Sequence, residues 1–278
     1  MAQIHCNFFS YSLGYPVDIE VTLPSFTSCN LHLPHTHALP GKFPVLYLLH
    51  GHGNDYQAWL RYTSAERYAE EYRMAVVTFS CHNKAYQNAP LGENFYDFLN
   101  EELPEFVENY FPVSGRAEER YIAGLSMGGY GALTNGLKYG ETFGYVVALS
   151  AALILGRADT AIDDVNAPYV VRKGYLEDCF GDLAKIKGSD MDYEALLLNA
   201  LKAKKPLPKL YFACGTEDGL IEANRAYVKF LKKNKVDCTF VEAPGVHAWN
   251  FWDEHILKAM DWLPLEGKTD GINSGNVK

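Results

Sequence analysis

Residues 120–133 read Arg-Tyr-Ile-Ala-Gly-Leu-Ser-Met-Gly-Gly-Tyr-Gly-Ala-Leu, and this stretch decides the fold. It contains Gly-x-Ser-x-Gly as Gly124, Ser126 and Gly128, between an apolar strand-like segment and a helix-like one. A serine at the tip of a sharp strand-to-helix turn has a strained backbone that exposes its hydroxyl, and the glycines let strand and helix approach closely. The first N–H groups of the helix point toward any negative charge beside the serine. The stretch therefore predicts a nucleophile elbow with Ser126 as the nucleophile.

Apolar runs on both sides of this turn are typical of strands buried on both faces of a parallel sheet. They predict strands at residues 43–49, 74–79, 121–125, 145–149, 209–214 and 237–241. Helical spacing predicts helices at residues 57–72, 95–110, 128–139, 221–234 and 250–262. Residues 3–13 and 17–24 predict an opening antiparallel hairpin. The alternation of strands and helices predicts an α/β fold with a doubly wound, mostly parallel sheet.

The domain organisation follows from where this rhythm holds. Residues 1–265 are expected to form a single α/β domain, and residues 25–41, rich in Ser, Thr, His and Pro, a loop within it. The stretch 152–206 breaks the alternation and is predicted to be a lid-like insertion over the carboxyl ends of the strands, where ligands bind in such sheets. The polar, Gly-rich residues 266–278 are expected to form a flexible tail.

Charge and composition exclude several classes of function. The net charge of −9, with acidic and basic residues mixed along the chain, argues against nucleic acid or an anionic membrane as a partner. No apolar run approaches the ~20 residues needed to span a bilayer. The acidic group Glu101, Glu102, Glu105 and Glu108 is expected to be a solvated helix face rather than a catalytic pair.

The six cysteines are scattered without C-x-x-C spacing, so neither a disulfide framework nor a metal site is expected. The first residues lack the basic start and apolar core of a signal peptide, which predicts a cytoplasmic protein.

A serine nucleophile needs a base and a group that orients the base, and in this fold they follow in the order serine, acid, histidine. Only His247 and His255 lie downstream of Ser126. His247 sits in a turn-rich loop after the last predicted strand, whereas His255 lies in the middle of a predicted helix. Because a loop at a strand's end can reach the elbow, His247 is the predicted base.

Two neighbouring carboxylates, Glu217 and Asp218, follow the preceding strand, and both fit the position of the acid. An aspartate in a Gly/Thr turn is held by local hydrogen bonds to backbone N–H groups, which suits an orienting group. We therefore predict Asp218 as the acid and keep Glu217 as the alternative.

The oxyanion of an acyl-transfer reaction needs two donors. One is the backbone N–H of Met127, directly after the nucleophile. The second is predicted to be the backbone N–H of His52, in the loop His50-Gly51-His52-Gly53 that follows the strand at 43–49. His50 is expected to cap that strand rather than to act in catalysis. Loss of one such donor typically costs about 3–4 kcal/mol of transition-state stabilisation.

Four motifs together resemble the esterase D/tributyrin esterase branch of the α/β-hydrolases, over nearly the whole chain. They are His50-Gly51-x-Gly53-Asn54 with Trp59, the elbow, Cys214-Gly-Thr-Glu-Asp218, and His247-x-Trp-x-Phe-Trp-Asp253. The resemblance implies a serine esterase that hydrolyses short-chain acyl esters, acetyl to butyryl, on small molecules, with no metal or organic cofactor. Deacetylation of carbohydrate esters and self-association into homo-oligomers are further expectations.

The same family includes S-formylglutathione hydrolases and feruloyl esterases, which remain alternatives. Tyr130 stands where the formylglutathione enzymes usually carry histidine, which lowers the weight of that reading. Gly51, Trp59 and Leu153 are predicted to contact the substrate, Leu153 by shortening the acyl pocket. An acyltransferase, or a non-catalytic binding protein on the same fold, is the alternative outside this class.

Overall fold

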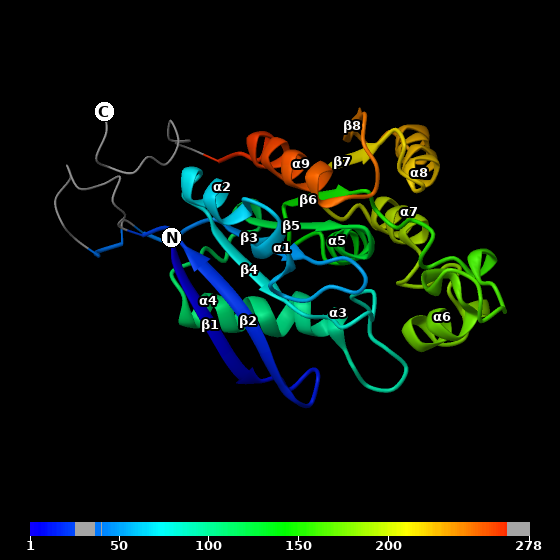
Figure 1. Cartoon of the computed structure of the whole chain (residues 1–278), viewed down its shortest axis with the longest axis horizontal. Coiled ribbons are helices and arrows are strands. Elements are labelled where there is room, and N and C mark those ends of the chain that lie inside the picture. The colour runs from blue at the N-terminus through cyan, green and yellow to red at the C-terminus, as the bar shows by residue number, and fades with distance from the viewer. Residues whose placement is uncertain (26–36, 40, 266–278) are drawn as a thin grey trace.

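One eight-stranded sheet organises the molecule, shown in Figure 1 as a computed structural model that describes residues 1–25, 37–39 and 41–265. The strand order is β1-β2-β4-β3-β5-β6-β7-β8. The first two strands pair antiparallel, β2 pairs antiparallel with β4, and the others are parallel. The predicted α/β fold and opening hairpin are thus confirmed. Most of the predicted loop at 25–41 and all of the predicted tail at 266–278 lie outside the described residues.

The strands are β1 (Ala2–Phe9), β2 (Pro16–Leu23), β3 (Val45–Leu49), β4 (Ala75–Phe79), β5 (Arg120–Leu125), β6 (Tyr145–Leu149), β7 (Lys209–Gly215) and β8 (Thr239–Ala243). The helices are α1 (Ala58–Tyr62), α2 (Ala65–Glu71), α3 (Phe95–Asp97), α4 (Leu103–Tyr110), α5 (Met127–Lys138), α6 (Lys173–Phe180), α7 (Tyr193–Ala203), α8 (Ile221–Lys233) and α9 (Trp249–Trp262). Short 3₁₀ turns occupy 117–119, 158–160, 169–171 and 183–185.

Alternate side chains of the central strands enter two separate cores, because successive residues of a strand point to opposite faces. On β3, Val45, Tyr47 and Leu49 belong to one core, while Leu46 and Leu48 belong to the other. Helices α1, α2 and α9 contribute to the second core, and α4, α5 and α8 to the first, so both faces are covered (Figure 1). This double burial explains the near-continuous apolar runs of the central strands.

The single helix predicted at residues 57–72 is two helices in the structure, α1 and α2. The chain becomes extended at Thr63, with φ −137° and ψ 173°. The hydroxyl of Thr63 donates to the carbonyl of Trp59 and accepts from the N–H of Ala65, at 2.5 and 3.1 Å. These bonds satisfy the end of one helix and the start of the next, so the break carries little hydrogen-bonding cost.

The helix predicted at residues 95–110 contains a π-helical turn, Phe98–Glu102, between α3 and α4. Glu102 is only 3% exposed, so its assignment to a solvated face is wrong. Its carboxylate accepts from the hydroxyl of Ser10 and from the N–H groups of Tyr11 and Ser12, at 2.7, 2.8 and 2.9 Å. Those contacts fix the turn between β1 and β2, which is why the carboxylate is buried.

The stretch 152–206, described throughout, contains α6, α7 and three of the 3₁₀ turns and contributes no strand to the sheet. Its helices bury apolar side chains against the same core as α5, through Tyr175 and Leu176 of α6 and Tyr193 and Leu197 of α7. The insertion is therefore packed on the body of the protein, and its role as a lid stays a prediction.

Candidate active site

Ser126 lies between the end of β5 and the start of α5, with φ +54° and ψ −116°. A positive φ is strained for a residue with a side chain. The crossing of strand and helix explains the flanking glycines: a side chain on Gly124 would collide with the backbone of Gly128, and one on Gly128 would meet the carbonyl oxygens of Leu49 and His50 at 2.5 and 2.6 Å. The predicted elbow geometry is present.

His247 lies in the turn between β8 and α9 and connects Ser126 to Asp218. Its Nε2 is 3.0 Å from Oγ of Ser126, and its Nδ1 is 2.8 Å from Oδ2 of Asp218. With Nδ1–H donating to the carboxylate, Nε2 is left to accept the serine proton. The side chain of His247 is 38% exposed, whereas that of Asp218 is 1% exposed. The imidazole is therefore open to solvent, while the carboxylate is enclosed beneath it.

Asp218 stays ionised because its environment favours the charged form. Burial would raise the pKa of its carboxyl, but hydrogen bonds from His247, the N–H of Leu220 and the hydroxyl of Ser150 outweigh burial and lower the pKa below its ordinary value. The bond from Leu220 is 2.9 Å long. A carboxylate held in this way fixes the orientation of the imidazole and stabilises the imidazolium that forms during acyl transfer.

Glu217, the alternative acid, has a different set of partners. It accepts from the hydroxyl of Thr216 at 2.8 Å and from the N–H of Gly245 at 2.6 Å. The bond from Gly245 and the bond from Thr216 lower its pKa. Glu217 thus ties down the loop that carries His247, and the structure brings Asp218 rather than Glu217 to the imidazole. His255 lies in α9, where its Nδ1 bonds the carbonyl of Phe251 at 2.9 Å.

In the loop after β3, one peptide unit has its carbonyl fixed by hydrogen bonds, and its N–H points in the opposite direction. The carbonyl of Gly51 accepts from Nδ1–H of His50 at 2.8 Å and from the N–H of Asn54 at 3.3 Å. The N–H of His52 belongs to the same peptide unit and points the opposite way, because the peptide is trans. Among the described residues, no acceptor is found for the N–H of His52 or for that of Met127.

His50 has the structural role expected of it. It is 1% exposed, and its Nε2 accepts from the N–H of Cys81 at 3.1 Å while Nδ1–H holds Gly51. Burial lowers the pKa of His50 to about 4. The neutral ring, protonated on Nδ1, satisfies both partners, so His50 secures the loop after β3.

The three predicted substrate contacts have different positions. Gly51 lies against the elbow, where a side chain would approach Leu125 Cδ1 to 2.5 Å and Cβ of Ser126 to 3.5 Å. Trp59 and Leu153 are each 1% exposed and belong to the cores, so neither presents surface to a substrate, which corrects that prediction. The indole of Trp59 instead donates to the carbonyl of Leu49 at 2.8 Å and secures the end of β3.

Two residues near the triad were missed by the sequence analysis. The indole N–H of Trp252 donates to Ser150 Oγ at 3.1 Å, and the hydroxyl of Ser150 helps to lower the pKa of Asp218. The ring of Trp252 also meets the imidazole of His247 edge to face, with centroids 4.8 Å apart. Trp252 entered the sequence analysis only as part of the His247–Asp253 motif, and Ser150, directly after β6, carries no local signal of a role.

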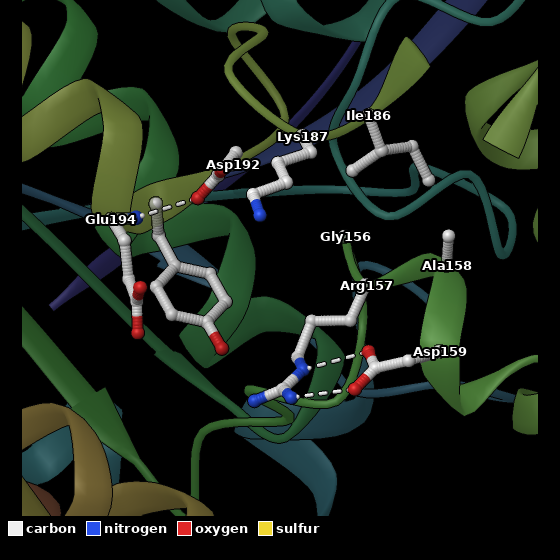
Figure 2. Close-up of a pocket in the computed structure, with 9 residues that line it drawn as sticks. Gly156, Arg157, Ala158, Asp159, Ile186, Lys187, Asp192 and Glu194 are labelled. Carbon is white, nitrogen blue, oxygen red and sulfur yellow. Dashed lines mark hydrogen bonds and ion pairs between the residues drawn. The ribbon is translucent and has the colours of Figure 1, made fainter. Parts of the chain in front are cut away.

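A separate cavity of about 440 Å³ opens within the insertion. Figure 2 shows its lining, in which Arg157 forms two hydrogen bonds with Asp159 and the carboxylate of Asp192 accepts from the N–H of Glu194. None of the triad residues lines it. Arg157 is therefore neutralised by its neighbour, and the cavity is distinct from the site around Ser126.

The arrangement has the parts of an acyl-transfer site: a hydroxyl, a histidine to accept its proton, a buried carboxylate behind it, and two N–H groups, of His52 and Met127, that have no acceptor among the described residues. Within the described ranges, no three His, Cys, Asp or Glu side chains are grouped as metal ligands. Nor does any helix of the described chain have the length and apolar character to cross a bilayer.

Comparison with known proteins supports the same chemistry. Residues 22–263 match the family model described as "Putative esterase". A curated acetyl esterase from Caldicellulosiruptor saccharolyticus is 38% identical over 220 residues, which are 79% of this chain and 82% of that protein.

Solved structures are similar over most of the chain. The fluorophosphonate-binding serine hydrolase F of Staphylococcus aureus has 32% identity and a TM-score of 0.82, with 94% of this chain and 98% of that chain covered. An S-formylglutathione hydrolase from Staphylococcus aureus has 32% identity and a TM-score of 0.80, with the same coverage.

Proposed function

This chain belongs to that esterase family, on the α/β-hydrolase fold, and is a serine carboxylesterase; from this premise we propose that Ser126, His247 and Asp218 are its catalytic triad and that it hydrolyses short-chain acyl esters, acetyl to butyryl. The observation that carries the proposal is the unbroken chain of hydrogen bonds from Ser126 through His247 to Asp218, at 3.0 and 2.8 Å.

The reaction follows from that chain of bonds. Nε2 of His247 takes the proton of Ser126 as Oγ attacks the ester carbonyl, and the electron pair of the carbonyl moves onto its oxygen. The tetrahedral species collapses, the alkoxide leaves with the proton from His247, and an acyl-enzyme remains. Water then attacks the acyl carbon, gives its proton to His247, and the acid is released as Ser126 regains a proton.

The N–H groups of His52 and Met127 are the proposed donors to the oxyanion. Support comes from the anchored carbonyl of Gly51 and from the position of Met127 at the first turn of α5. The helix contributes partial positive charge at that end, which stabilises the developing negative charge.

An acetyl group is the favoured acyl group, because a relative with 38% identity is an acetyl esterase. The alcohol portion includes carbohydrate among its candidates. The second candidate function is thioester hydrolysis, favoured by the 32% identity with an S-formylglutathione hydrolase. Tyr130, at the position where the formylglutathione enzymes usually carry histidine, is fully buried in this chain. Its hydroxyl donates to the carbonyl of Met191 at 2.7 Å.

A cytoplasmic location is part of the proposal. The described cysteines, Cys6, Cys81, Cys179, Cys214 and Cys238, are free thiols, as is usual in a reducing compartment. Small-molecule esters are the proposed ligands, and self-association stays a prediction.

The test is hydrolysis of p-nitrophenyl esters from acetyl to dodecanoyl, with S-formylglutathione as a separate substrate and Ser126→Ala as the control. We expect a steep fall in kcat/KM beyond butyryl and no turnover by Ser126→Ala. A fluorophosphonate should label the native protein and not the variant. Turnover retained by folded Ser126→Ala contradicts the assignment of the nucleophile. A kcat/KM for S-formylglutathione far above that for the acetyl ester moves the function to the thioester class.

A further inference from the structure

One side chain of the insertion touches both residues assigned to the oxyanion. We propose that Tyr175, on α6, is a positioning residue that keeps the N–H groups of His52 and Met127 in a fixed position relative to each other. The inference rests on the proposed function, because it concerns the same site. It makes the insertion a structural part of the oxyanion site.

The geometry places Tyr175 between the two donors' side chains. Its ring meets the imidazole of His52 edge to face, with centroids 5.4 Å apart and an interplanar angle of 88°. Its hydroxyl lies 3.7 Å from Sδ of Met127. Tyr175 is 6% exposed, so both contacts are shielded from water. The loop after β3 and the first turn of α5 are thus joined through one buried side chain.

His52 depends on ring packing for its position. Its Nε2 is buried and has no hydrogen-bond partner among the described residues. Tyr169 packs on the same imidazole at 5.1 Å, and Tyr169 and Tyr175 lie 4.9 Å apart. Burial lowers the pKa of His52, which favours the neutral ring against these aromatic partners. Since the described residues offer this nitrogen no hydrogen bond, packing against Tyr169 and Tyr175 helps to determine where the ring lies.

Tyr169 differs from Tyr175 in two respects that make it a matched control. It is 50% exposed, and among the described residues its ring contacts His52, Tyr175 and Arg172 but not Met127. Removal of Tyr169 therefore loosens the packing on His52 and on Tyr175 but leaves the contact between Tyr175 and Met127 in place. Removal of Tyr175 separates the two donors.

The position of Tyr175 is itself secured. The thiol of Cys179, one helical turn further along α6, donates to the backbone carbonyl of Asn83 at 3.2 Å. The side-chain oxygen of Asn83 accepts from the N–H of Gly53, in the loop of His52, at 2.8 Å. The helix carrying Tyr175 and the loop carrying His52 are therefore both connected to Asn83. Such a connection limits how far the two can move apart.

The test compares an acetyl ester with its thionoester, in which sulfur replaces the carbonyl oxygen. Oxyanion donors stabilise the oxygen compound far more than the sulfur compound, so the ratio of the two kcat values reports on the donors. A general loss of folded enzyme lowers both rates and leaves the ratio unchanged. The variants are Tyr175→Leu, Tyr175→Phe and Tyr169→Leu.

We expect Tyr175→Leu to lower kcat for the oxygen ester about 10-fold, with KM within about two-fold, and to lower the oxygen-to-sulfur ratio to match, because displacement of a donor costs less than its complete loss. Tyr175→Phe, which keeps the ring, should show a smaller fall of about three-fold. Tyr169→Leu should leave the ratio within two-fold of the native value.

An unchanged oxygen-to-sulfur ratio in folded Tyr175→Leu overturns the inference. A fall of this ratio in Tyr169→Leu as large as that in Tyr175→Leu also overturns it, because the effect would then come from ring packing on His52 alone. If the native protein hydrolyses no ester, the proposed function fails separately. The positioning role of Tyr175 is then tested by ¹⁵N relaxation. The order parameters of the His52 and Met127 amides should fall in Tyr175→Leu and not in Tyr169→Leu, and unchanged order parameters in Tyr175→Leu overturn the inference.

Discussion

The indole of Trp252 meets the imidazole of His247 edge to face, with ring centroids 4.8 Å apart and an interplanar angle of 87°. The same indole donates to Ser150, whose hydroxyl helps to lower the pKa of Asp218, and Asp218 bonds His247. One buried tryptophan therefore contacts the imidazole directly and reaches the carboxylate side of the pair through Ser150.

Replacement of Trp252 by Phe should lower kcat by about three- to ten-fold with little change in KM. The variant keeps an aromatic ring beside His247 but removes the donor to Ser150, and a lost buried hydrogen bond costs about 1 kcal/mol. Steady-state kinetics and urea unfolding measure the two effects. Trp249→Phe is the control. Trp249 packs on Trp59 and Trp252, so this variant changes aromatic packing in the same place but keeps the donor to Ser150. Equal losses in both variants would contradict a specific role for Trp252.

Replacement of Asp218 by Asn should lower kcat by about 10³–10⁴, because the amide stabilises neither the required tautomer nor the imidazolium. Glu217→Gln should lower kcat less than about 10-fold, since its amide oxygen can still accept from Gly245. The two adjacent variants share a turn and differ only in which carboxylate is removed. A larger loss for Glu217→Gln would reverse the assignment of the acid.

The buried imidazole of His50 should make stability depend on pH. Its pKa is lowered by burial from 6.5 to about 4, so between these values the unfolded chain takes up a proton that the folded chain does not. Stability is full above pH 6.5 and falls as the pH drops toward 4, by about 1.4 kcal/mol per pH unit and about 3 kcal/mol in all. Protonation would also set Nε2–H against the N–H of Cys81.

Urea unfolding of the native protein and His50→Gln between pH 4 and 7 measures this contribution. The variant should show a shallower dependence by about one proton. His52 and His255, whose pKa values are also lowered by burial, contribute equally to both proteins. Parallel curves would show that His50 does not titrate in this range.

Two Gly→Ala substitutions in or beside helices should act in opposite directions. Gly128→Ala places a methyl group 2.5 Å from the carbonyl oxygen of Leu49 and should destabilise the protein by about 2–3 kcal/mol and abolish activity. Gly174→Ala, in α6, meets nothing within 4 Å and should stabilise the protein by about 0.5 kcal/mol. Thermal unfolding of both variants measures these changes in stability. A stable, active Gly128→Ala would contradict the close crossing of β5 and α5.

Local patterns predicted the sheet well because they report burial. The apolar runs that became β3, β4 and β5 are buried at every residue, and their bounds lie within two residues of the prediction. The break at Thr63 was missed because apolar periodicity does not report the hydrogen bonds of the Thr63 hydroxyl; the N–H of Ser64 also bonds Asp253, 189 residues further along, at 2.7 Å. Periodicity within a window carries no information on such a partner.

Candidate residues differ in the same way. Order along the chain and turn chemistry selected Ser126, His247 and Asp218, and the structure brings these three within hydrogen-bond distance, while their catalytic roles stay a prediction. Trp59 was misjudged because a motif shows that a residue belongs to a site and not which way it faces. Its 1% exposure is a property of the packed core.

The sequence by itself determined the fold class, the elbow and the family, because glycine spacing, apolar period and motif order are local or ordered along the chain. Only the tertiary structure brought Asp218 rather than Glu217 to His247, placed Trp252 against His247 and Ser150, and set Tyr175 against both His52 and Met127. Those relationships depend on distances between segments separated by tens to more than a hundred residues, and such distances exist only after the sheet has assembled and its loops have packed.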